Sequence, residues 1–526
     1  MNALFLTQGR SLALFHDLYC ALKRQGHVQG AGFFVADSQY YDAFRRARPQ
    51  FEADPSLSVL KEWQIQTEAR GRQFDAARLR EYERRYGRPT LWDAVVADRR
   101  VFLGRRATYT QDYAPRLSHA QMLALLETTV SRLEELFERV RPDFVVSFIC
   151  VTMGEYLGWR LAEYRGIPFL NLRPTRVKNY IYAGEDVLEP SARLEAAYRA
   201  LLEAGGGDGL AGAAAYLEAA RATHALYEGV VKPSVRPPEA SLAEGQASAR
   251  LPLRLGAAAC GLLRHHLRYR SDHHVPDLLG QGVYRRLVKP WRARQMERQL
   301  RGGYVGAGQL PGLGYAFFPL HTEPEVTLLV YSKPFLNQIE VARLLAMSLP
   351  AAMKLVVKEH PWSVGKRKLS YYRKLLEIPN LVLAPPEMTA RELVKHARLV
   401  AVISGSVALE ALILRKPVIT LGRAPFNFLP STMLRHVKDL EGLSSEVAGL
   451  LEGHRHDELA LQCYLAAVME NSVPVDLYSL LLGRAGAYSE RDRGTDAGTE
   501  RQRQIELLAA YLIGRLKGGG RPGALG

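Results

Sequence analysis

The sequence predicts an α/β protein with two Rossmann-like domains, each containing a parallel sheet, plus helical insertions. At 526 residues the chain is too long for a single hydrophobic core. Between Tyr315 and Leu421, short apolar runs alternate with helical segments, a pattern typical of a parallel, doubly wound sheet. Two further β-α-β patterns lie nearer the start, at 3–35 and 143–172.

The composition is that of a globular protein with a basic surface. Hydrophobic residues make up 47% and charged residues 24% of the chain, and 70 Lys and Arg against 54 Asp and Glu give a net charge of +16. This excess of basic residues is typical of a soluble enzyme rich in arginine. It is equally typical of a protein that binds nucleotide donors, anionic glycans or an anionic membrane surface. We find no helix-turn-helix, zinc-finger or RNA-binding signature, so nucleic acid is not an expected partner.

Four cysteines lie far apart in the sequence, at positions 20, 150, 260 and 463. None has the spacing of a metal or redox motif, which indicates free thiols in a reducing compartment. Met1–Gln8 lacks the basic start and long apolar core of a secretory signal, and no apolar run is long enough to span a bilayer. We therefore expect a cytoplasmic protein that can lie peripherally at the inner membrane.

The predicted strand 354–358 ends in a basic pair that can hold phosphate. His360 precedes a proline, which favours an extended backbone and directs its imidazole out of the carboxyl end of the strand. Lys358 lies two residues earlier and so shares a side of the strand with His360. A donor imidazole and a positive charge suit a phosphate oxygen. A surface lysine and a loop-capping histidine are the structural alternative.

A second strand end carries small and hydroxyl residues. Ser404, Gly405 and Ser406 stand between the predicted strand 400–403 and a short helix. Backbone N–H groups at such a junction bind phosphate, Gly405 permits close approach, and the hydroxyls add donors. Glu410, about one turn later, can accept hydrogen bonds from a ribose. Ordinary N-capping by Ser406 and a dipole interaction of Glu410 explain the same residues structurally.

The sequence predicts two domains joined by a linker, followed by a helical segment and a disordered tail. The boundaries are 1–301 for an acceptor domain with helical insertions, 302–314 for a Gly-rich linker, 315–485 for a nucleotide-sugar domain, 486–516 for a helical segment and 517–526 for the tail. Within the insertions, 42–112 is expected to be helical. The basic segment 250–270 suits either a helix between domains or one lying on anionic lipid.

Several stretches together resemble the capsule polysaccharide biosynthesis family. They read Lys-Glu-His-Pro at 358–361, Ile-Pro-Asn-Leu-Val-Leu at 378–383, Ser-Gly-Ser-Val-Ala-Leu-Glu at 404–410, and Lys-Pro-Val-Ile at 416–419 with Gly422. Phe-Pro-Leu-His at 318–321 and Glu-Pro-Glu at 323–325 also fit. The resemblance covers roughly 315–428, and the opening Leu4–Gly9 is similar but weaker.

The resemblance implies a GT-B fold, in which two Rossmann-like domains face each other across a cleft. The family includes transferases that move Kdo from CMP-Kdo to a lipid or glycan. In related transferases the His-Pro pair holds CMP and a hydroxyl pair holds its phosphate, which places these roles on His360 and on Ser404 and Ser406. Such enzymes usually need no bound metal, and the sequence shows no metal-ligand cluster. No cofactor beyond the donor is expected.

A catalytic group is expected from the first domain, across the cleft. Glu155, just beyond the predicted strand 143–150, could deprotonate the acceptor or stabilise an oxocarbenium-like centre, with His360 as the second catalytic candidate. A solvated glutamate at a helix start is the alternative for Glu155. Gln8 and Arg10, after the first strand, are candidates for contact with an anionic sugar.

The leading hypothesis is a glycosyltransferase of capsule or surface polysaccharide synthesis. Its expected partners are a nucleotide-sugar donor, with CMP-Kdo first, a lipid or polysaccharide acceptor, the inner-membrane surface and export machinery. Two alternatives stay open at this point. One is transfer of glycerol- or ribitol-phosphate from CDP-activated donors, as in teichoic acid polymerases. The other is a non-catalytic module that binds polysaccharide or lipid during export.

Overall fold

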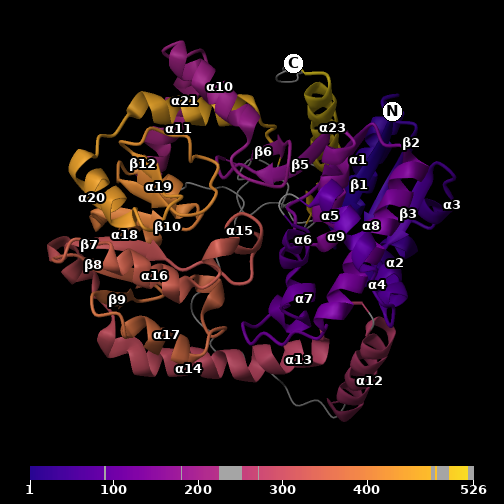
Figure 1. The fold of residues 1–526 in the computed structure, drawn as a ribbon, viewed down its shortest axis with the longest axis horizontal. Coiled ribbons are helices and arrows are strands. Elements are labelled where there is room, and N and C mark those ends of the chain that lie inside the picture. Colours follow the sequence, from indigo (N-terminus) through magenta and orange to yellow (C-terminus); the bar gives the residue numbers. More distant parts are fainter. Residues whose placement is uncertain are drawn as a thin grey trace.

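Two six-stranded sheets organise the protein, each in its own lobe (Figure 1). The structure is a computed structural model that describes residues 1–87, 90–178, 180–223, 251–270, 272–475, 480–481 and 497–518. The first sheet has the order β3-β2-β1-β4-β5-β6 and the second has the order β12-β11-β10-β7-β8-β9. This confirms the predicted α/β class with two Rossmann-like domains.

The first sheet is parallel except at its edge, where β6 runs antiparallel to β5. Its strands are β1 Asn2–Thr7, β2 Gly30–Val35, β3 Leu57–Lys61, β4 Phe144–Ser147, β5 Phe169–Pro174 and β6 Ile181–Gly184. Ala3 and Phe5 of β1 face the side where α1 (Ser11–Arg24) packs, and Leu4 and Leu6 face the opposite side. Because helices cover both faces, the strand is apolar at every position rather than alternating.

The second sheet is entirely parallel. Its strands are β7 Tyr315–Pro319, β8 Lys354–Lys358, β9 Leu381–Ala384, β10 Leu399–Val402, β11 Val418–Thr420 and β12 Leu434–His436. The chain builds outward from β7 through β8 to β9, then returns to the other side of β7 with β10. The order therefore reverses between β7 and β10, and ligands of open α/β sheets bind at such a reversal. In the first sheet the reversal lies between β1 and β4.

Helices connect the strands in both lobes. In the first lobe they are α2 Ser38–Ala47, α3 Gln50–Ala53, α4 Glu62–Ala69, α5 Ala76–Tyr86, α6 Trp92–Ala97, α7 Arg99–Phe102, α8 His119–Val140 and α9 Met153–Tyr164. In the second they are α15 Val326–Leu329, α16 Gln338–Met347, α17 Leu369–Leu376, α18 Ala390–His396, α19 Val407–Ile413, α20 Leu443–Gly453 and α21 Glu458–Glu470.

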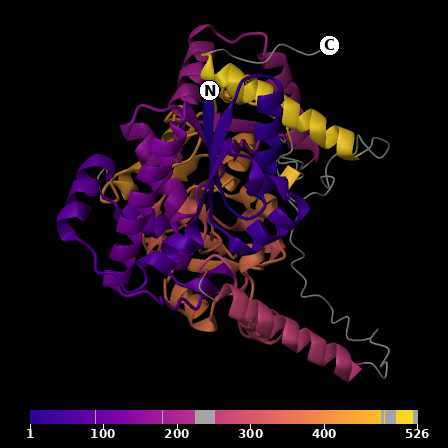
Figure 2. The same ribbon diagram turned by 90° about the vertical axis from the view of Figure 1, so that its right-hand side faces the viewer.

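The two lobes exchange helices. α10 (Ala192–Glu203) and α11 (Leu210–Thr223) follow the first sheet in the chain but pack against α21 in the second lobe. Arg221 of α11 forms a two-pronged ion pair with Glu458 at 2.6 and 2.9 Å. Conversely, α23 (Ala497–Leu516) returns from the second lobe to pack on α1 of the first (Figure 2).

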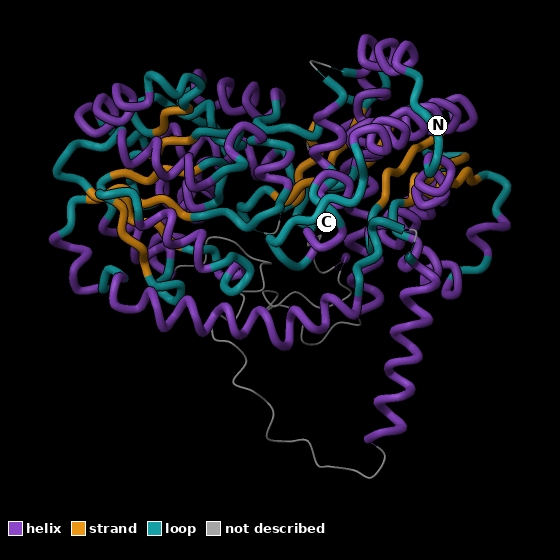
Figure 3. Tube along the Cα trace, turned by 60° about the horizontal axis from the view of Figure 1, so that its bottom comes forward, coloured by secondary structure: helices purple, strands orange, loops and turns teal. Residues whose placement is uncertain are grey.

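A long helix bridges the lobes along one edge of the molecule (Figure 3). It consists of α13 (Leu278–Val283), a π-helical turn at Tyr284–Val288 and α14 (Lys289–Leu300). Arg292 of α14 pairs with Asp112 of the first lobe at 2.6 Å, and the Tyr284 hydroxyl donates to the Gly365 carbonyl of the second lobe at 2.9 Å. α12 (Leu251–Tyr269) projects from the same edge (Figure 2).

Three strands were not predicted from the sequence: β3, β6 and β12. β6 is buried but only four residues long, and it was not recognised as a strand. The stretch 42–112 was expected to be helical, yet it contains β3, whose side chains are only half-buried and give a weak apolar signal. The short edge strand β12 was missed for the same reason. The predicted tail, 517–526, lies almost wholly outside the described residues.

Gly365 is the glycine whose geometry most limits substitution where the bridging helix meets the second lobe. Its φ is +77°, and a Cβ there would lie 2.4 Å from the Lys289 carbonyl oxygen. We expect Gly365→Ala to lower the free energy of unfolding by about 1–3 kcal/mol, through the positive φ and the clash. Urea unfolding measures the change. Gly303→Ala, where a Cβ meets nothing within 4 Å, is the matched control and should be close to neutral; equal effects would contradict the packing argument.

Candidate active site

The chain reversal of the second sheet brings two loops into contact. His321 follows β7, and Ser404 follows β10. The Ser404 N–H donates to Nε2 of His321 at 3.4 Å, so the proton of this neutral imidazole resides on Nδ1. A Cβ on Gly405 would lie 3.1 Å from Cε1 of His321, so glycine lets the ring sit close against the turn. The sequence analysis placed His321 in the family pattern but did not select it as a site residue.

His360 lies on the other side of the β7 loop. Its Nδ1 is 2.8 Å from Oγ1 of Thr322 and accepts the Trp362 N–H at 3.2 Å. Since Nδ1 accepts a backbone N–H, the proton of the neutral ring is on Nε2, which makes no hydrogen bond with the residues that the structure describes. His360 therefore offers an Nε2–H donor, and the loop 321–322 lies between it and the Ser404 turn.

Both imidazoles are neutral at physiological pH. Burial, together with the charges of His360, Arg176 and Arg367, lowers the pKa of His321 to about 3. Burial lowers the pKa of His360 to about 4, although the Glu359 carboxylate acts in the opposite direction. A pair of neutral rings can orient a ligand and donate hydrogen bonds without adding charge.

A buried polar network holds the two histidine loops in place. The side-chain amide of Gln338 clamps the backbone of His321, accepting its N–H at 2.7 Å and donating to its carbonyl at 3.1 Å. Arg367 also donates to that carbonyl, at 2.7 Å, and forms an ion pair with Glu359, the residue just before His360. The Tyr372 hydroxyl completes the set by donating to Glu359 at 2.6 Å.

The remaining predicted residues of the second lobe surround this centre. Lys358 is buried, its Nζ donates to the Glu359 carbonyl at 3.3 Å, and its charge is among those that lower the pKa of His360. Ser404 donates its hydroxyl to the Arg423 carbonyl. Ser406 is exposed at the start of α19 and makes no side-chain capping bond, so the capping alternative is wrong. Glu410 is half-buried in the first turn of α19.

In the first lobe, Gln8 lies at the corresponding reversal, between β1 and β4. Its Nε2 donates to the Ile149 carbonyl at 2.9 Å, which ties the loop after β1 to the loop after β4. Arg10 is exposed at the N-cap position of α1. Gln8 and Arg10 thus lie at the carboxyl edge of the first sheet, as predicted from their place after the first strand.

Glu155 is fully buried, so its alternative description as a solvated helix-start residue is wrong. It forms a capping box with Thr152 at the start of α9, and Oε2 accepts the Val151 and Thr152 N–H groups at 3.0 and 3.1 Å. Burial raises its pKa to about 8, against the lowering effect of these bonds. Its catalytic role stays a prediction.

The fold assembles a charged cluster beside Glu155 that sequence spacing did not reveal. Glu62, Asp98 and His274 are all buried, with ligand-type atoms within 4.8 Å of one another. Nε2 of His274 lies 2.9 Å from Glu62 and 3.6 Å from Asp98. Although burial lowers the pKa of His274, the two carboxylates raise it to about 9. A protonated imidazole between two carboxylates therefore accounts for the cluster as an ion triad.

A pocket between the lobes joins the two chain reversals. Its volume is about 130 Å³, and its wall includes Ile149 of the first lobe and Ser404 of the second. Arg176, in the connection from β5 to β6, lines the same pocket. Its φ is +64°, unusual for a residue with a side chain, and its Nη1 is buried without a hydrogen-bond partner among the described residues. Arg176 also interacts electrostatically with the carboxyl of Glu325, which lines the same pocket. These features make Arg176 a candidate for binding an anion.

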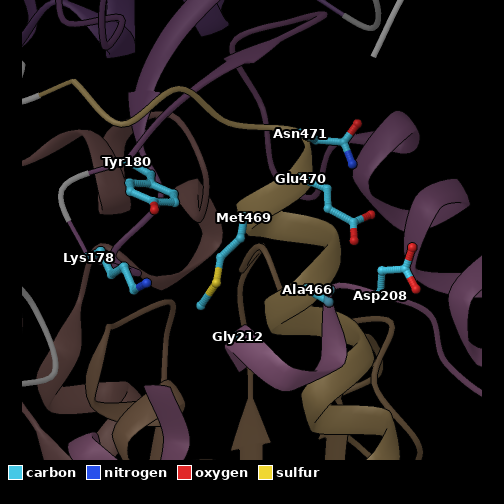
Figure 4. Close-up of a pocket in the computed structure, with 9 residues that line it drawn as sticks. Lys178, Tyr180, Asp208, Gly212, Ala466, Met469, Glu470 and Asn471 are labelled. Atoms are coloured by element: carbon cyan, nitrogen blue, oxygen red, sulfur yellow. The ribbon is translucent and has the colours of Figure 1, made fainter. Parts of the chain in front are cut away.

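A second, larger hollow lies elsewhere in the protein. A hollow of about 660 Å³ lies between the connection from β5 to β6 and α21, with Lys178 and Tyr180 on one side and Glu470 and Asn471 on the other (Figure 4). It contains none of the predicted site residues and lies at neither chain reversal. Of the predicted site residues, Ser404 lines the smaller pocket and His360 does not. We take the smaller pocket, together with the adjoining loops that carry His321 and His360, as the candidate active site.

Two sheets whose chain reversals share one pocket define a GT-B-like α/β protein. Residues 338–441 match the family described as capsule polysaccharide biosynthesis protein. This segment, about a fifth of the chain, includes His360, the Ser404–Ser406 turn and Glu410. The family resemblance is therefore confirmed over this segment. None of the curated proteins compared with the chain matches it.

Similar solved structures include two Kdo transferases. The Thermosulfurimonas dismutans KpsC β-Kdo 2,4-transferase is 13% identical, with a TM-score of 0.33, and the match covers 62% of this chain and 79% of the transferase chain. The KpsC β-Kdo 2,7-transferase from the same organism is also 13% identical, with a TM-score of 0.34, and the match covers 74% of this chain and 90% of the transferase chain. The Neisseria meningitidis UDP-GlcNAc 2-epimerase bound to UDP-GlcNAc is 12% identical, with a TM-score of 0.28 over 89% of this chain and 98% of its own. At these TM-scores the likeness carries no argument about the site.

The neutral imidazoles predict a specific pH dependence. An unfolded histidine takes up a proton near pH 6.5, whereas folded His360 does so only near pH 4. Between these values the unfolded state binds more protons, so the free energy of unfolding falls as the pH drops from 6.5 towards 4. Urea unfolding of the wild type should show this loss, and His360→Gln should show a shallower one. If the free energy of unfolding depends on pH equally in both proteins, the His360 ring is accessible to solvent and its pKa is close to that of an unfolded histidine.

Proposed function

We propose that the protein is a glycosyltransferase of capsule or surface polysaccharide biosynthesis. It takes a sugar, with Kdo as the first candidate, from a CMP-activated donor and passes it to a lipid or glycan acceptor. The observation that carries the proposal is the position of His360 and the Ser404 turn on either side of the β7 loop. His360 contacts Thr322 and Ser404 contacts His321, so both flank the loop after β7, and both lie within the segment that matches the family.

The donor phosphate belongs at the Ser404–Ser406 turn in this proposal. Gly405 lets the His321 ring lie against this turn, and Ser406 is exposed beside it, so a phosphate here would contact the exposed side of the turn. His360 adds its Nε2–H as a neutral donor to the CMP moiety, and Lys358 adds positive charge from behind the ring. Glu410 takes the ribose hydroxyls as an acceptor.

Arg176 would complete the anion site from the first lobe. It shares the pocket with Ser404, and its charge is one of those that lower the pKa of His321. The neighbouring Arg173 is already paired with Glu189 at 3.0 Å, whereas no ion pair of Arg176 occurs among the described residues. A cation without such a partner, opposite a phosphate turn, suits an oxyanion such as a phosphate or a sugar carboxylate.

The acceptor side is assigned to the carboxyl edge of the first sheet. Gln8 and Arg10 are the proposed contacts with an anionic sugar. Glu155 as a base would need α9 to open towards the cleft, because its carboxyl is buried and its raised pKa keeps it protonated at neutral pH. In the observed conformation Glu155 holds the loop that carries Ile149 into the pocket. Metal-free chemistry remains part of the proposal.

Replacing His360 tests the donor site. We expect His360→Ala to weaken CMP binding by about 10- to 100-fold, the loss of a hydrogen bond to a charged group, while the protein stays folded. Isothermal titration calorimetry measures the affinity, and circular dichroism checks the fold. His266→Ala, on the exposed face of α12, is the matched control. Wild-type affinity in His360→Ala would refute the site.

A thermal-shift screen separates the proposal from its rivals. Stabilisation by CMP and CMP-linked acid sugars supports the transferase. Stabilisation by CDP-glycerol or CDP-ribitol alone would favour polyol-phosphate transfer. A shift with an anionic glycan and with no nucleotide would identify a binding module instead.

Replacing Arg176 by glycine should separate binding from stability. We expect Arg176→Gly to weaken CMP binding by about 10-fold or more, through loss of a charge-assisted hydrogen bond. The free energy of unfolding should stay level or rise by about 1 kcal/mol, because glycine relieves the positive φ. Lys178→Gly is the control: its φ is +51°, but its side chain lines the other hollow. An equal loss of affinity in both variants would trace the effect to the backbone rather than the guanidinium.

A further inference from the structure

The bridging helix presents an unusual row of exposed apolar side chains. Leu279, Val283, Leu287 and Trp291 are 47%, 56%, 66% and 56% exposed and lie four residues apart. With Leu263 and Leu267 of α12, which repeat the same spacing, they account for six of the fourteen large exposed apolar side chains among the described residues. Such concentration on neighbouring helices is a mark of an interaction surface.

The π-helical turn keeps this row straight. In an α-helix, residues four apart advance by about 400°, so four such residues would drift by about 120° around the axis. The turn at Tyr284–Val288 is wider, with the Lys289 N–H donating to the Tyr284 carbonyl five residues back. Each residue of a wider turn advances less, which counteracts the drift. Pro290 follows this turn and has no N–H to donate, which favours such a local irregularity.

Three other side chains of the same helix are buried in the protein. Tyr284, Met296 and Leu300 are nearly inaccessible, and the last two belong to the core of the second lobe. The helix is therefore anchored to the protein through these side chains and leaves its apolar row exposed. This orientation is one expected of a helix lying in an interface.

The charge of the surrounding residues indicates what binds to this apolar row. Between 278 and 300 the chain has six basic residues, Arg285, Arg286, Lys289, Arg292, Arg294 and Arg298, and one acidic residue, Glu297. Segment 251–270 has four arginines and no acidic residue. Arginine stems lie along apolar surface with their charged ends outward, and tryptophan favours the headgroup level of a bilayer. No helix in the described part of the chain is long and apolar enough to cross a membrane.

We propose that the face formed by Leu279, Val283, Leu287 and Trp291, flanked by the exposed Arg286 and Arg294, docks the protein on an anionic lipid bilayer. The apolar row enters the headgroup region and the arginines pair with lipid phosphates. This surface is distinct from the basic segment 250–270 considered from the sequence, and it does not depend on the glycosyltransferase proposal. Because the helix contacts both lobes, docking would hold the pocket between them at a constant orientation to the membrane.

Vesicle sedimentation tests the proposal with the full-length protein. The probes are vesicles of phosphatidylcholine alone and vesicles with about a quarter phosphatidylglycerol, in about 0.1 M salt, where charges act over about 10 Å. We expect the wild type to bind the anionic vesicles and to bind less at high salt. Leu287→Ser/Trp291→Ser and Arg286→Glu/Arg294→Glu should each lower the bound fraction about fivefold or more.

The matched control removes two apolar side chains exposed elsewhere. Met347→Ser/Leu376→Ser, at positions 73% and 40% exposed on α16 and α17, should bind anionic vesicles like the wild type. Circular dichroism and urea unfolding check that all variants are folded. The proposal is overturned if the wild type does not bind anionic vesicles, or if Leu287→Ser/Trp291→Ser binds as well as the wild type. A dimer that becomes monomeric in that variant, without any vesicle binding, would instead assign the row to a second copy of the chain.

Discussion

The buried contact between Arg367 and the loops on either side of it is the constraint on which the candidate site depends. Its guanidinium bonds to the carbonyl of His321 and to the carboxylate next to His360, so one cation determines where both imidazoles lie. Gln338 fixes the same loop from the other side through two backbone bonds. A buried charge is costly unless it is paired. Here Glu359 and Glu323 pair with Arg367, and this pairing also positions the site.

This constraint places two uncharged imidazoles beside a buried ion pair in the candidate site. Burial suppresses protonation of the imidazoles, which then act through oriented N–H and lone-pair directions. In the proposed function, the positive charge for an anionic ligand would come from Lys358, which is close enough to lower the pKa of His360, and from Arg176 in the pocket. Separation of orientation from charge lets the lobes contribute different parts of one binding site.

Sequence reasoning predicted the second sheet well because its strands are continuous apolar runs between clear turn signals. β8 and β9 were placed at the residues found, and the polar residues after β8 and β10 led to His360 and Ser404. The role of His321 was missed because a lone histidine after a strand has no local signature; its importance comes from contact with Gly405, 84 positions away. Arg176 and the triad around His274 were missed for a similar reason, because their roles depend on residues far away in the sequence. β3 was missed because it is a half-buried edge strand with a weak apolar pattern.

The exchange of helices between the lobes has a consequence for dissecting the protein. α10 and α11 cover α21, while α23 covers α1. Each lobe's hydrophobic core therefore contains helices from both halves of the sequence, and cleaving the chain at one point would not separate the two cores. A fragment starting at the linker would leave the α21 surface around Tyr464 bare and carry an unattached α23. Each half thus completes its partner's core, and the two lobes are expected to unfold as one cooperative unit rather than as separable modules.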